Sequence, residues 1–155
     1  MLDIKENVVK IQAILDKTAQ SLTEQASACV SKLGCCMNMI YDKHCAFGWA
    51  VRHAGVPVDH LFFKAYGGVS CTSDKLIDTK WEWIRHEHIS GLWVMLQQMH
   101  DASVVNWSED ERTDVQVREN MCKYLHSLRV RYPMLNFDKF EEYIKKTEIT
   151  RYAND

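Results

Sequence analysis

Apolar positions recur with helical spacing along most of the chain. Between residues 2 and 33 they return at intervals of three, four or seven residues, and polar residues fill the positions between them. This spacing places the apolar side chains on one face of an amphipathic helix. Gly34 stands where a left-handed C-cap would stand, so we expect the helix to end there. The stripe consists of Val8, Ile11, Leu15, Leu22, Ala26, Cys29 and Leu33.

Three further helices are expected in the middle of the chain. A second helix is predicted over residues 36–53, because Gly55 follows it and a proline comes two residues later. A short helix is expected over residues 60–66, where a pair of glycines halts it. Residues 74–104 contain only one weak helix breaker, a single glycine, and an apolar stripe at helical spacing. This segment is therefore predicted to be the longest helix.

The last third of the chain contains signals for two more helices. The run Ser108-Glu109-Asp110-Glu111 matches a capping box, so a helix is expected to begin at Glu109 and to end before Pro133. A final helix is expected from Phe137 to about residue 146. No segment shows the alternation that is typical of strands. The sequence therefore predicts an all-α fold, an irregular bundle of about five to six helices, in a single domain over residues 1–155 whose last few residues are frayed.

Composition and charge narrow the class of protein. The net charge is −2, 46% of residues are hydrophobic and 26% are charged, which is the balance of an ordinary globular domain. No basic stripe is present, so nucleic-acid binding is not expected. No apolar run reaches the roughly 18 residues that a membrane span requires, and the N-terminus does not resemble a secretory signal. We therefore expect a cytoplasmic protein without membrane contact.

The cysteines are expected to be reduced thiols. The chain contains six of them, and a disulfide framework would be typical of a short secreted protein with a signal peptide. No such signal precedes these cysteines, and free cysteine is among the residue types most often buried. Most of the six are therefore expected to fill space in the core.

One dipeptide suggests metal chemistry. The run Met99-His100-Asp101-Ala102-Ser103 resembles the helix of HD-domain phosphohydrolases, in which adjacent His and Asp hold a divalent metal. This resemblance implies a metal that polarises a phosphoryl oxygen and activates water. It also implies an upstream histidine and a downstream aspartate as further ligands. The candidates are His60 or His53, and Asp114 or Asp138.

Tryptophan placement favours a binding surface instead. Trp81 fits the apolar stripe of the predicted long helix, whereas Trp83 lies about 200° and Trp93 about 120° from it around the helix axis. The three rings cannot all enter one core, so at least one is expected to be exposed. An exposed tryptophan is typical of a surface that binds a partner, although Trp83 could also pack under another helix of the chain.

The first helix suggests a second such surface. Its stripe approaches the heptad spacing of a helix pair, which suits a contact between two copies of the chain. The same stripe could equally pack on the chain's own long helix. The leading prediction is a helical module without chemistry of its own, an adaptor, subunit or inhibitor that binds a protein partner and forms a homodimer, with no cofactor and no metal. The HD-type phosphohydrolase is the alternative. The predicted partner-binding residues are Trp83, Trp93, Val8, Ile11 and Leu15, and the alternative metal ligands are His60, His100 and Asp101.

Overall fold

The computed structural model describes residues 4–29, 39–40, 43–56, 87–106 and 111–152. About 70% of this part of the chain is helical, and its five helices form one body, which confirms the predicted all-α class. Within the same residues, no helix is both long enough and apolar enough to cross a membrane. The elements are α1 (Ile4–Gln25), β1 (Met39–Ile40), β2 (Lys43–His44), α2 (Ala46–His53), α4 (Glu87–Asp101), β3 (Val104–Asn106), α5 (Asp114–Arg131), α6 (Asp138–Lys146) and β4 (Thr150–Tyr152).

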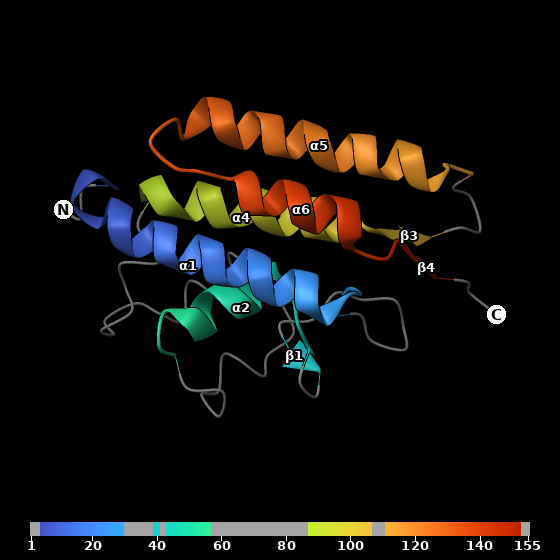
Figure 1. The fold of residues 1–155 in the computed structure, drawn as a ribbon, viewed down its shortest axis with the longest axis horizontal. Helices are drawn as coiled ribbons and strands as arrows, with labels where there is room; N and C mark the ends of the chain where they lie inside the picture. The colour runs from blue at the N-terminus through green and yellow to red at the C-terminus, as the bar shows by residue number, and fades with distance from the viewer. Residues whose placement is uncertain (1–3, 30–38, 41–42, 57–86, 107–110, 153–155) are drawn as a thin grey trace.

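The helices pack as neighbours around one core. Helices α2 and α5 lie on opposite sides of the body, and α1, α4 and α6 lie between them (Figure 1). Helix α1 contacts α2 and α6, while α4 contacts α2 and α5. At the contact between α4 and α5, Gly91 allows close approach, because a Cβ there would lie 2.9 Å from the Tyr132 hydroxyl. The largest fully buried side chains include Trp93, Tyr143, Phe47 and Phe137.

Helix α1 ends earlier than its apolar stripe predicts. It stops at Gln25, and Ala26 adopts a left-handed backbone with φ of 68°. The Ala26 carbonyl accepts a hydrogen bond of 2.7 Å from the backbone N–H of Glu148, which lies just beyond α6. Long-range contact therefore fixes this end, where the sequence pointed to a local stop at Gly34. Gly34 itself lies outside the described residues.

The predicted helix over residues 36–53 is wrong in its first half. Strands β1 and β2 form a short antiparallel hairpin there, pairing Met39 with His44, and α2 begins only at Ala46. Cys45 is its N-cap, since its Sγ accepts a hydrogen bond of 3.2 Å from the backbone N–H of Gly48. Gln97 of α4 satisfies a second N–H of the same turn, that of Phe47, at 3.0 Å. The first turn of α2 is therefore capped by a cysteine and by a glutamine from another helix.

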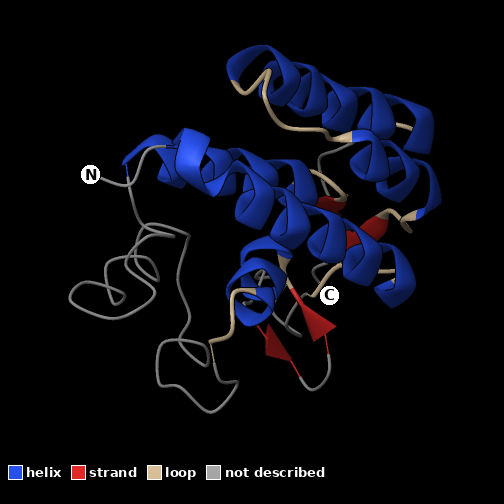
Figure 2. Ribbon diagram, turned by 60° about the vertical axis from the view of Figure 1, so that its left-hand side comes forward, coloured by secondary structure: helices blue, strands red, loops and turns tan. Residues whose placement is uncertain are grey.

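The prediction of no strands is also wrong. Besides the hairpin, β3 pairs in parallel with β4 from the C-terminal end, joining Val104 to Thr150 and Val105 to Arg151. Figure 2 shows these pairs as two separate small sheets beside the helices. Because β3 occupies residues 104–106, the long helix predicted over residues 74–104 ends at Asp101. Its predicted beginning and the short helix over residues 60–66 lie outside the described residues.

The C-terminal helices match the prediction at three of their four ends. Helix α5 stops at Arg131, before Pro133, as predicted, and α6 begins within one residue of Phe137 and ends at Lys146. The predicted start of α5 is wrong. The helix begins at Asp114, where Thr113 and Gln116 form a full capping box, and not at Glu109.

Candidate functional site

The apolar stripe of α1 lies in the core. Ile11 and Leu15 are 0% exposed, and Val8 is half-buried against the same core. The expectation that Ile11 and Leu15 offer a surface to a partner is therefore corrected, because the chain's own helices cover them. Helical spacing alone cannot separate these two uses, since a stripe that packs internally and one that packs on a partner have the same period.

Trp93 is a core residue as well. Its side chain is 1% exposed, and its Nε1 has no hydrogen-bond partner in the described part of the chain. This corrects its predicted place on a binding surface. Its displacement from the stripe is explained by neighbours on more than one side, because α4 packs against both α2 and α5. Trp83 lies outside the described residues.

The His100-Asp101 pair does not have the geometry that the HD-domain resemblance implies. The His100 ring is buried, and its Nδ1 lies 2.8 Å from the Tyr143 hydroxyl of α6. Burial lowers the pKa of His100 to about 4. Asp101 instead accepts a hydrogen bond of 2.6 Å from Gln97, the residue that caps α2. The two side chains therefore have their contacts on different helices.

The other residues implied by that resemblance are engaged elsewhere. His53 contacts Ser21, Asp114 pairs with Arg151 at 2.6 Å, and Asp138 pairs with Arg129 at 3.0 Å. Among the described residues, no group of three or more His, Cys, Asp or Glu side chains could hold a metal ion. His60 lies outside these residues. What the structure describes therefore gives the alternative no assembled site.

A surface groove lies where α1 meets the connection between α5 and α6. It has a volume of about 780 Å³ and is lined by Gln12 and Asp16 of α1, Arg129 of α5 and residues 133–139. Met134 is 45% exposed there, whereas Leu135 and Phe137 are 7% and 1% exposed. The buried pair anchors the connection to the core and leaves Met134 facing outward.

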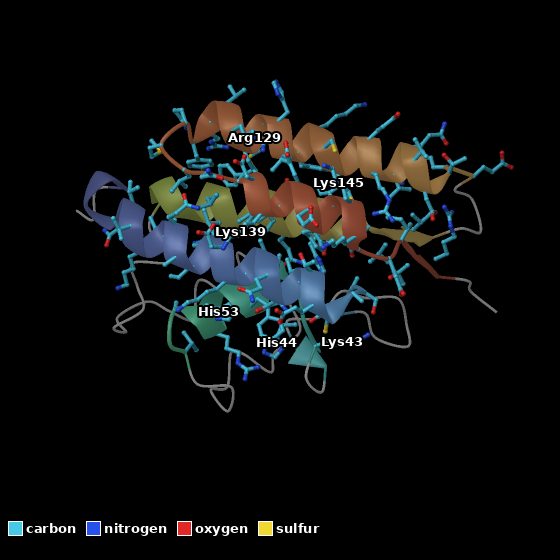
Figure 3. The ribbon with its side chains drawn as sticks, in the orientation of Figure 1. Lys43, His44, His53, Arg129, Lys139 and Lys145 are labelled. Carbon is cyan, nitrogen blue, oxygen red and sulfur yellow. The ribbon has the colours of Figure 1, made fainter. Side chains whose placement is uncertain are left out.

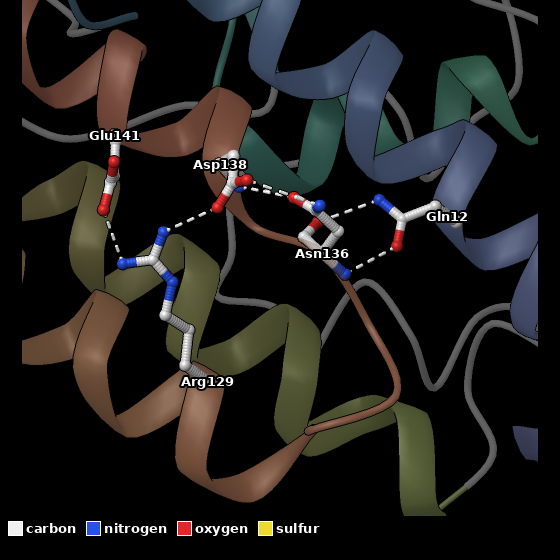
Figure 4. A network of polar contacts seen from close by, with 5 residues as sticks. All are labelled: Gln12, Arg129, Asn136, Asp138 and Glu141. Carbon is white, nitrogen blue, oxygen red and sulfur yellow. Dashed lines mark hydrogen bonds and ion pairs between the residues drawn. The ribbon is translucent and has the colours of Figure 1, made fainter.

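A polar network holds the walls of this groove together (Figure 4). The Gln12 side chain donates to the Asn136 carbonyl at 2.8 Å and accepts from the Asn136 N–H at 2.7 Å. Gln12 Nε2 also donates to Asp16 at 3.0 Å. The Asn136 side chain accepts a hydrogen bond of 2.8 Å from the backbone N–H of Asp138, the first residue of α6. One glutamine thus ties both backbone groups of a turn residue to α1.

The charges of the groove are unequal. Arg129 pairs with both Asp138 at 3.0 Å and Glu141 at 2.6 Å, so one guanidinium faces two carboxylates (Figure 4). Asp16 adds a third carboxylate and Lys139 a second cation. The groove and the ion pair behind it therefore have an excess of one negative charge.

A second polar cluster joins α1, β2 and α2. The Trp49 ring contacts two histidine rings, with centroids 4.2 Å from His44 and 5.5 Å from His53. Gln25 Oε1 accepts from Trp49 Nε1 at 3.0 Å and from the His44 backbone N–H at 2.8 Å. Figure 3 shows His44 and His53 on the same side of the molecule as Lys43. Neither this cluster nor the groove was predictable from the sequence, because each depends on residues that are distant along the chain.

Comparisons with known proteins give no further guidance. No family model, no curated protein and no solved structure matches the chain.

Proposed function

We propose that the chain binds another protein, and that the groove between α1 and the α5–α6 connection receives a segment of that partner. The observation that carries this proposal is the groove of about 780 Å³, whose walls are fixed by hydrogen bonds in the absence of a partner. The two bonds between Gln12 and Asn136 fix the turn, so little conformational entropy is lost on binding. Such preorganisation favours affinity.

The lining indicates the chemistry of the partner segment. Met134 provides an adaptable apolar contact, because its side chain is unbranched and polarisable. Asp16 and the two carboxylates around Arg129 outnumber the cations Arg129 and Lys139 by one. The segment that fits carries an apolar side chain next to a lysine or arginine. Complementary charge of this kind gives specificity and speeds association.

A site-specific cross-linking experiment tests the proposal. A photo-reactive phenylalanine analogue replaces Met134, and the same analogue replaces Val115 as the control. Val115 is 65% exposed on α5 and lies about 21 Å along the helix from Arg129. We expect one protein to be cross-linked from Met134 in the native cell and not from Val115. The captured peptide is expected to contain a basic residue.

Binding measurements with the purified partner then complete the test. Met134→Asp should weaken binding by roughly 30-fold, the loss expected at an interface hot spot of about 2 kcal/mol. Asp16→Lys should also weaken binding of the partner, whereas Val115→Asp should leave the dissociation constant unchanged. Equal cross-linking from both positions, or binding that is insensitive to both groove variants, would refute the proposal.

A further inference from the structure

Ser21 of α1 and His53 of α2 form a hydrogen-bonded pair across a helix interface. The Ser21 Oγ lies 2.8 Å from the His53 Nε2, although 32 residues separate the two in sequence. This distance is within the reach that a general base needs to take a proton from a hydroxyl. The pair is independent of the groove, so it concerns a second property of the chain.

The surroundings hold the imidazole in place and keep it neutral. The His53 ring stacks on Trp49 with an interplanar angle of 15°, and the hydrogen bond from Trp49 to Gln25 fixes the indole. Partial burial lowers the pKa of His53, and the positive charges of Lys17 on α1 and Arg52 on α2 lower it further. Arg52 itself lies 3.0 Å from the Nε2 of His44, the other histidine that contacts Trp49. A neutral His53 can accept a proton at neutral pH.

Ser21 opens onto a small cavity. The cavity has a volume of about 280 Å³, and Ser21 lines it together with Glu24, Gln25, Lys43 and Trp49. Lys43 donates to the Ser27 hydroxyl at 2.7 Å, which holds its ammonium group beside the cavity. An ammonium has three donors, so Lys43 can also stabilise a negative oxygen that develops near Ser21. Nucleophile and cation therefore line one cavity, and the base is joined to the nucleophile by the hydrogen bond between Ser21 and His53.

We propose that Ser21 is a nucleophile that His53 activates for acyl transfer from small carboxylic esters. The Ser21 oxygen forms a bond to the acyl carbon while its proton passes to His53 Nε2. The tetrahedral oxyanion forms in the cavity that Lys43 lines. When it collapses, the bond from the acyl carbon to the leaving oxygen breaks, and that oxygen takes the proton from His53 as the alcohol departs. Water then attacks the acylated serine with His53 as base, which releases the acid and restores both residues.

The test uses p-nitrophenyl acetate as the probe, with p-nitrophenolate release and peptide mass spectrometry as readouts. We expect an acetyl group on Ser21 and a release rate that rises with pH through a midpoint below 6.5, because His53 must be neutral. His53→Gln should lower the rate roughly 100-fold or more, in the range for loss of a general base. Ser21→Ala should abolish serine acetylation, and Ser127→Ala, at an exposed serine of α5, should change nothing.

The outcomes separate the proposal from simpler chemistry. Circular dichroism melts first establish that each variant is folded. If Ser21→Ala does not fold, Ser21→Cys provides a second test. In the cysteine variant, iodoacetamide should label residue 21 more slowly once His53→Gln is added. Acetylation that is confined to lysine, or Ser21 acetylation that His53→Gln does not slow, would overturn the proposal.

Discussion

Acid should weaken the fold through one buried histidine. His100 is 1% exposed, its Nδ1 is engaged with the Tyr143 hydroxyl, and its Nε2 has no hydrogen-bond partner in the described part of the chain. Protonation would place a positive charge in the core with no group to compensate it at Nε2. Burial therefore lowers the pKa of His100 from 6.5 to about 4.

The sign and size of the effect follow from linkage. The folded pKa lies below the unfolded one, so the unfolded chain binds the proton more tightly. Stability from this group is complete above pH 6.5 and is lost as the pH falls toward about 4. At 1.36 kcal/mol for each pH unit between the two pKa values, the loss is about 3 kcal/mol. That is a large share of the 5–15 kcal/mol that is typical of a domain.

Urea unfolding at a series of pH values measures this loss. The wild-type free energy of unfolding should fall by about 3 kcal/mol more between pH 7 and pH 4 than that of His100→Asn. The comparison uses only the pH dependence, so the cavity that the substitution creates cancels. His126→Asn, at an exposed histidine of α5, should behave as wild type. If His100→Asn showed the wild-type pH dependence, the reasoning would fail.

Two further predictions follow from burial. Leu15→Glu should unfold the chain, because it places a charge in a core position that is 0% exposed, while Val9→Glu, at a position 84% exposed on the same helix, should keep the wild-type melting temperature in circular dichroism. A folded Leu15→Glu monomer would instead support the helix-pair interface that the sequence suggested. A thiol reagent should modify exposed Cys122 in the folded protein and spare Cys29 and Cys45, because both are buried and burial raises the pKa of Cys45 to about 12. Equal modification rates for Cys45 and Cys122 would contradict this.

Periodicity predicted the helices because their apolar faces are long and regular. Ile11, Leu15 and Leu22 are buried in α1 as their spacing requires. The end of α5 before Pro133 was also predictable, since proline constrains its own backbone and that of the residue before it. These features depend on neighbours within about one helical turn, and such information is present in the local sequence.

The strands and several helix ends were not predictable for the opposite reason. Each strand contains only two or three residues, too few for an alternating pattern to emerge. The beginning of α5 was predicted from the capping-box pattern at Ser108, whereas the structure has its capping box at Thr113 and Gln116. Helix α2 begins at a cysteine cap supported by Gln97, which lies 50 residues from the N–H that it accepts. No local pattern contains that contact.

The candidate sites were hidden because each is made of ordinary residues that only the fold brings together. Gln12 and Asn136 are 124 residues apart, and a lone glutamine on a helix gives no sign that it will clamp a turn. Tryptophan and an apolar stripe were the strongest sequence signals for binding. They also have the most apolar area to bury, and Trp93 and Leu15 are accordingly buried in the core. In a chain of this size, the largest apolar groups are therefore the weakest guides to a binding surface. The better guide is a surface such as the groove at Met134, where polar contacts fix the backbone next to a solvent-exposed apolar side chain.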